Sequence, residues 1–151
     1  MGSNSKYRIL AIDPGSKFAG LAGLLYKSHG PMPIGTLDLN SKGFPLETSR
    51  NISILEFCRK AKFGTIACGL PSPPKIFPIL SYITGILNLD SENVKFVNES
   101  FTSSLSGLTK TTNYMDVHTV AALHIIELYL VSNQLSDKSS ANSMASDDDL
   151  S

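Results

Sequence analysis

Three acidic residues stand where a predicted strand ends or a predicted helix begins. Asp13 closes the apolar run 7–12, Glu99 follows the run 94–98, and Asp116 precedes a long apolar stretch. Hard cations such as Mg²⁺ require several oxygen ligands that converge from separate elements of a rigid scaffold. The three carboxylates therefore predict metal-dependent phosphodiester chemistry, with Mg²⁺ or Mn²⁺ as the cofactor.

Each of these acids also has a purely structural interpretation. Asp13 precedes Pro14-Gly15 and could form a turn, Glu99 could cap a helix or face solvent, and Asp116 could favour a helix start. His118 lies near the same predicted helix start and could be a metal ligand, a general base or a phosphate contact. Asp13, Glu99, Asp116 and His118 are the candidate catalytic and metal-binding residues.

Four further residues could contact a nucleic acid. Lys17 and Lys75 each follow a glycine-containing turn and could meet a phosphate as a point charge. Ser100 and Thr102 follow Glu99 and could donate hydrogen bonds to phosphate oxygens. Solvated lysines and an ordinary polar loop would give the same pattern, so both interpretations stay open.

The apolar periodicity predicts the elements that must position these residues. They are strands at 7–13, 18–26, 33–39, 63–68 and 94–98, and helices at 46–62, 75–87 and 117–131. A three-strand meander followed by alternating helices and strands describes an α/β domain with a mixed sheet. Short crossovers make the later strands parallel to the first, and ligands gather at the carboxyl ends of such strands. Asp13, Gly69 and Glu99 all follow such ends.

Length and composition predict one domain with an acidic tail. The 151 residues are 42% hydrophobic and 17% charged, with 13 basic and 13 acidic residues. Residues 136–151 hold four acids and one base, which leaves twelve bases against nine acids, or about +3, in the rest of the chain. We expect a flexible lead at 1–5, a domain at 6–135 and a disordered tail at 136–151. The positive balance slightly favours a polyanionic partner.

Cysteine usage and hydropathy bear on the compartment. Cys58 and Cys68 lie in apolar contexts, which predicts buried free thiols in a reducing environment. No apolar run approaches the ~18 residues of a membrane span, and residues 1–6 lack the apolar core of a secretory signal. We therefore expect a cytoplasmic protein without a membrane partner, with the nucleus or an organelle left open.

Four short motifs follow one another along the chain. Residues 13–22 read D-x-G-x-x-x-x-G-x-A, and residues 69–71 read G-L-P. Residues 98–103 read N-E-S-F-T-S, and residues 121–130 read A-A-L-H-I-I-E-L-Y-L. In this order they resemble the motifs of the YqgF/RuvX family of Holliday junction resolvases, whose third and fourth motifs are D-E-R-L-T-T and A-A-x-x-I-L-x-x-Y-L. The resemblance implies a divergent member with an RNase H-like fold, in which helices flank a five-stranded mixed sheet.

The resemblance also implies a three-carboxylate, Mg²⁺-dependent nuclease, or a descendant of one, that resolves branched DNA or matures ribosomal RNA. Asp13 and Glu99 stand at its first two acidic positions, where two bound Mg²⁺ would assist an in-line displacement. His118 occupies the position of the third acid and Asp116 lies two residues earlier, so the two share that place. Ser100 replaces the arginine of D-E-R.

Functions of different classes therefore stay open. One is a metal-dependent endonuclease on branched DNA or structured RNA. The other is a catalytically inactive RNase H-like domain that binds nucleic acid or protein as a structural component, which the altered third acid and the lost arginine favour. A phosphate-binding ATPase-type domain also begins with D-x-G, but this chain is short for a second lobe. Resolvases of the RuvC type act as dimers, which would imply a homodimer, although the sequence reveals no dimer face.

Overall fold

The computed structural model describes residues 8–25, 30–70, 76–98 and 116–132. The strands within these ranges are β1 (Ile9–Asp13), β2 (Phe18–Leu24), β3 (Met32–Asp38), β4 (Thr65–Leu70) and β5 (Val94–Asn98). The helices are α1 (Ser49–Ala61), α2 (Ile76–Leu87), the short 3-10 helix η3 (Ser91–Asn93) and an α-helix at 117–132.

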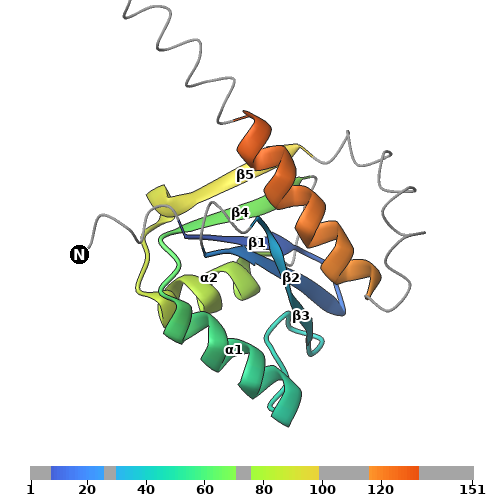
Figure 1. The fold of residues 1–151 in the computed structure, drawn as a ribbon. Coiled ribbons are helices and arrows are strands. Elements are labelled where there is room, and N and C mark those ends of the chain that lie inside the picture. Colours follow the sequence, from blue (N-terminus) through green and yellow to red (C-terminus); the bar gives the residue numbers. More distant parts are fainter. Residues whose placement is uncertain (1–7, 26–29, 71–75, 99–115, 133–151) are drawn as a thin grey trace, which may run out of the picture.

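The strands form one five-stranded mixed sheet in the order β3-β2-β1-β4-β5 (Figure 1). β1 pairs antiparallel with β2, and β2 with β3, whereas β4 runs parallel to both β1 and β5. The predicted α/β fold is thereby confirmed, and the strand order agrees with an RNase H-like fold. The carboxyl ends of β1, β4 and β5 share one edge of the sheet.

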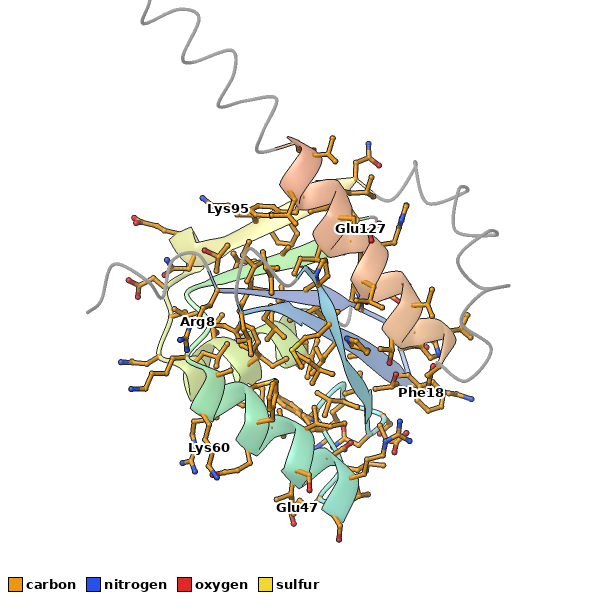
Figure 2. The ribbon with its side chains drawn as sticks, in the orientation of Figure 1. Arg8, Phe18, Glu47, Lys60, Lys95 and Glu127 are labelled. Carbon is orange, nitrogen blue, oxygen red and sulfur yellow. The ribbon has the colours of Figure 1, made fainter. Side chains whose placement is uncertain are left out.

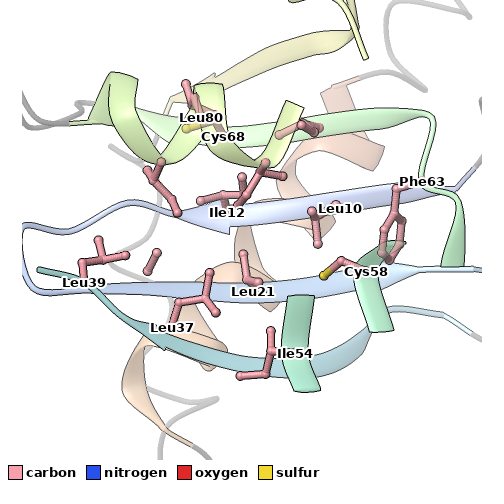
Figure 3. Packing of buried hydrophobic residues seen from close by; sticks show 14 of the residues in the cluster. Leu10, Ile12, Leu21, Leu37, Leu39, Ile54, Cys58, Phe63, Cys68 and Leu80 are labelled. Atoms are coloured by element: carbon pink, nitrogen blue, oxygen red, sulfur yellow. The ribbon is translucent and has the colours of Figure 1, made fainter. Parts of the chain in front are cut away.

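Helices cover both faces of this sheet. On one face, the side chains of β1, β2 and β4 pack against α1 and α2 in the core drawn in Figure 3, which includes Leu10, Ile12, Leu21, Cys58, Cys68 and Leu80. On the other face, Ile9, Ala11, Ala22 and Ala67 pack beneath Ile125 and Ile126 of helix 117–132. The buried residues of the central strands β1 and β4 are apolar because helices shield both faces of the sheet from water.

The predicted elements are present, with ends set by local contacts. The first helix begins at Ser49 rather than at residue 46, because the Thr48 side chain caps it by accepting a 3.1 Å hydrogen bond from the Asn51 backbone N–H. β4 extends to Leu70 because that residue still pairs with Asn98 of β5.

The predictions on cysteines and membrane spans can be compared with the structure as well. Cys58 and Cys68 are buried free thiols, as predicted. Burial raises the pKa of the Cys58 thiol to about 12. Among the residues that the structure describes, no helix combines the length and apolar content needed to cross a bilayer.

A buried amide fixes the connection between β3 and α1. The fully buried Asn51 side chain donates hydrogen bonds to the carbonyl oxygens of Asp38 (2.9 Å) and Leu46 (2.8 Å), and its Oδ1 accepts one from Asp38 N–H (3.1 Å). Only an amide can donate twice and accept once here, since a carboxylate is acceptor-only. Asn51 therefore ties the start of α1 to the end of β3.

We predict that Asn51→Leu lowers the free energy of unfolding by roughly 2 kcal/mol, because three part-buried hydrogen bonds to the backbone are lost, although the Asp38 carbonyl still accepts one from Leu46 N–H. Urea denaturation measures the change. Ser53→Ala, at an exposed position of the same helix, is the control and should change stability by less than ~0.5 kcal/mol. An Asn51→Leu protein as stable as the wild type would show that the amide network contributes nothing.

Asn51→Asp tests the same network by its pH dependence. Burial against two carbonyl oxygens disfavours the charged carboxylate, so the folded-state pKa of the new acid should rise above its unfolded value of ~3.9. Because the pKa of the new acid is raised in the folded state, Asn51→Asp should lose the least stability relative to the wild type below ~pH 4. The loss should grow as the pH rises above that value. Urea titrations of both proteins at matched pH values measure this trend. A difference that is independent of pH would contradict it.

Candidate functional site

A row of three residues crosses the sheet beneath the first turn of helix 117–132. Asp13 of β1 pairs with Gly20 of β2, and Gly20 pairs with Thr36 of β3. Residues paired across neighbouring strands project to the same face of a sheet, and this face is the one that helix 117–132 covers. The row thus places a carboxylate, a glycine and a hydroxyl side by side.

Gly20 lets the helix approach the sheet closely. A Cβ atom added at Gly20 would lie 1.9 Å from the carbonyl oxygen of His118 and 3.0 Å from its Cβ. Beside this contact, the buried hydroxyls of Thr36 and Thr119 lie 3.0 Å apart and share a hydrogen bond. The two contacts fix the first turn of the helix over β2 and β3.

His118 is thereby brought to the carboxyl end of β1. Its Nδ1 lies 3.8 Å from Oδ2 of Asp13, and the two side chains are 39% and 18% exposed. The His118 ring also stacks on the Phe18 ring, with centroids 5.2 Å apart and the planes inclined by 29°. Figure 2 shows Phe18 beside the first turn of the helix. The imidazole is thus positioned between a carboxylate and an aromatic ring.

Asp116 has a structural role at the same helix start. Its Oδ1 accepts a 2.9 Å hydrogen bond from His118 N–H, and its carbonyl oxygen accepts the first helical bond, from Val120 N–H at 3.0 Å. This is the geometry of a helix N-cap. Of the two residues that shared the third place in the predicted metal site, His118 faces Asp13 and Asp116 caps the helix.

The Asp13–His118 pair can provide two ligands to a divalent cation. Two ligands around an ion with bonds of ~2.1 Å lie about 3 Å apart when adjacent and about 4.2 Å apart when opposite. The observed separation of 3.8 Å equals neither value, so a side chain would have to shift by less than ~1 Å for both to bind one ion. Imidazole suits Mn²⁺ better than Mg²⁺, which prefers oxygen. Within the ranges that the structure describes, no three His, Cys, Asp or Glu residues are grouped for a metal ion.

The remaining predicted site residues are distributed as follows. Lys17 is exposed in the turn between β1 and β2, and its carbonyl oxygen accepts a 2.8 Å hydrogen bond from Leu39 N–H. The predictions for four others fall outside the described residues: Glu99, Ser100, Thr102 and Lys75. His124, on the same helix as His118, is buried at 7% exposure.

The sequence analysis did not identify Phe18, Thr36 and Thr119 as parts of the site. Phe18 carries a usable signal, because it is a large apolar residue directly after the turn that holds Lys17. The two threonines carry none, since they lie 83 positions apart and meet only through the packing of the helix on the sheet.

Comparisons with known proteins do not assign this chain to a family. A scan against protein-family models finds no match for this chain, and neither does a search of the curated proteins.

We predict that Gly20→Ala destabilises the protein by roughly 2 kcal/mol or more, because the new methyl group overlaps the His118 carbonyl and must displace the helix. Thermal unfolding measures the loss. Gly85→Ala in α2 is the matched control: its Cβ meets nothing within 4 Å, so it should be neutral or stabilising by up to ~1 kcal/mol. Equal effects of the two substitutions would contradict a close approach at Gly20.

We predict that Asp116→Ala costs ~1 kcal/mol of stability, whereas Asp116→Asn costs a few tenths at most, because asparagine keeps the capping oxygen. Chemical denaturation of both variants measures the difference. A large loss of divalent-cation binding in Asp116→Asn, with stability retained, would instead assign Asp116 to the metal site.

Proposed function

We propose that this chain is a divalent-metal-dependent endonuclease that acts on branched DNA or structured RNA, as a divergent member of the YqgF/RuvX family. The observation that carries the proposal is the Asp13–His118 pair, held at the carboxyl end of β1 by the close approach of helix 117–132. In open α/β sheets, ligands bind at such strand ends.

The chain's own residues have distinct parts in this proposal. Asp13 is a carboxylate ligand from the sheet, and His118 is an imidazole ligand from the helix, oriented by its stacking on Phe18. A bound Mn²⁺ or Mg²⁺ would supply Lewis-acid chemistry on a phosphodiester and a more acidic water. Asp116 supports the site indirectly by fixing the turn that carries His118.

Glu99 completes the ligand set in this proposal. It directly follows Asn98, which ends β5 in register with Leu70 of β4, at the same edge of the sheet as Asp13. Two strand spacings of ~4.8 Å separate β1 from β5.

A second function has an observation of its own in support. Asp116 caps the helix, and His118 stands where the YqgF/RuvX family has its third acid. The Asp13–His118 pair therefore contains one carboxylate. A catalytically inactive domain that binds nucleic acid or protein would need no more. The two functions differ in whether Asp13 and His118 bind a metal ion.

Calorimetric titration with Mn²⁺ and Mg²⁺ tests the proposal. We predict sub-millimolar Mn²⁺ binding that Asp13→Asn removes, because the variant loses the charged ligand. Cleavage of a four-way DNA junction and of a folded RNA should fall at least about 100-fold, since metal stabilisation of the transition state is worth several kcal/mol. Glu92→Gln is the control: this exposed acid precedes β5 at the opposite edge of the sheet and should bind metal as the wild type does.

His118→Asp distinguishes the two functions further. If His118 is a ligand, the substitution replaces nitrogen by oxygen and should shift the preference from Mn²⁺ towards Mg²⁺. Because a new carboxylate beside Asp13 could bind a cation by itself, His118→Phe is the decisive variant. It keeps a ring against Phe18 but removes the nitrogen, so it should abolish Mn²⁺ binding if His118 is a ligand and leave it unchanged if His118 is only structural. Absence of Mn²⁺ binding in the folded wild type, with junction and RNA left uncleaved, would favour the inactive domain.

A further inference from the structure

A hollow of about 620 Å³ lies between the start of β2 and the connection from β3 to α1. Lys17 and Phe18 line it from the first segment, and Asp38, Asn40 and Leu46 from the second. This volume lies within the ~300–1,000 Å³ range of small-ligand sites.

The two segments around the hollow are joined by backbone contacts. Leu39 N–H donates to the Lys17 carbonyl at 2.8 Å, which connects one side to the other. On the far side, Oδ1 of Asn40 accepts hydrogen bonds from the N–H groups of Lys42 (2.9 Å) and Phe44 (3.1 Å). The buried Asn51 amide fixes Asp38 at the end of β3. The hollow is therefore preformed rather than dependent on a ligand for its shape.

The lining combines groups that recognise a nucleotide. Lys17 is an exposed cation that suits a phosphate, and Phe18 is 39% exposed and can stack on a base. Asp38 has acceptor oxygens for a base amino group or a ribose hydroxyl, and Leu46, 42% exposed, provides an apolar surface. A purely apolar ligand would leave the cation and the carboxylate unused.

Phe18 connects the hollow to the candidate metal site. It lines the hollow and also stacks on His118, whose Nδ1 lies 3.8 Å from Asp13. The hollow and the candidate metal site therefore share Phe18 as a common wall.

We propose that this hollow binds one unpaired nucleobase with its sugar, on the strand whose phosphodiester lies at Asp13 and His118. The inference rests on the proposed action on nucleic acid, and it specifies the substrate: a strand with an unpaired or extruded nucleotide beside the scissile bond. Lys17 contacts the adjacent phosphate, and Phe18 forms the stacking surface.

Binding without metal tests this inference separately from catalysis. Fluorescence anisotropy of fluorescein-labelled oligothymidylate, measured in EDTA, should show binding that Phe18→Leu weakens roughly 5- to 100-fold, because the stacking surface is lost. Phe18→Trp, which keeps an aromatic ring, should retain it. Phe44→Leu is the matched control, since Phe44 is also 39% exposed but does not line the hollow.

Two further variants test the phosphate contact and the opposite side of the hollow. Lys17→Ala should reduce the slope of log affinity against log salt by about 0.7 for a single strand, whereas Lys60→Ala on α1, away from Phe18 in Figure 2, should leave it unchanged. Leu46→Glu adds a negative charge to the hollow and should abolish oligonucleotide binding while Mn²⁺ binding stays as in the wild type.

The outcomes separate this inference from the proposed function. Oligonucleotide binding that depends on Phe18 and Leu46, in a protein that binds no Mn²⁺, would support the nucleotide site and overturn the nuclease. Metal binding at Asp13 with no oligonucleotide binding, or with binding that Phe18→Leu and Leu46→Glu leave unchanged, would overturn the nucleotide site alone.

Discussion

The close approach of helix 117–132 to β2 at Gly20 is the contact on which the rest of the site depends. A carbonyl oxygen of the helix occupies the space that any other side chain at this position would fill. The helix also packs on the sheet through Ile125 and Ile126, which cluster with buried residues of β1, β2, β4 and β5. Close packing in a protein interior transmits small displacements, so a shift at Gly20 would move both the core and His118.

This contact explains how residues 105 positions apart in the chain come to form a pair. β1 is the central strand and ends at Asp13 at the edge where the parallel strands end. The helix is fixed along the sheet by the Thr36–Thr119 hydrogen bond and by the close approach at Gly20, while the Asp116 cap fixes its first turn. His118 lies between Asp116 and Thr119 in the chain. With the helix fixed in this way, the His118 side chain lies beside Asp13 and stacks on Phe18.

The fold was predictable from the sequence because it depends on periodicity, which is a local property. Alternating and continuous apolar runs predict the strands. Asp13 then falls at the carboxyl end of the first strand, where open α/β sheets commonly bind ligands. The Phe18–His118 stack and the Thr36–Thr119 bond were not predictable, since they depend on where a distant helix lies along the sheet. The Asn51 network could not be predicted from the sequence either, because a polar residue in a predicted helix is expected to face solvent.

Asp116 shows why residue type alone cannot assign a ligand. An acid just before a helix is equally suited to bind a cation and to cap the helix. The structure shows the capping role, because Oδ1 of Asp116 accepts a 2.9 Å hydrogen bond from His118 N–H. That cap in turn orients the imidazole. The proposed ligand set of Asp13, Glu99 and His118 would carry one negative charge fewer than three carboxylates, which would weaken attraction for a hard cation but also lower repulsion towards an approaching phosphate. The half-buried position of His118 follows from the same cap, because the turn that Asp116 fixes brings the imidazole between the Asp13 carboxylate and the Phe18 ring.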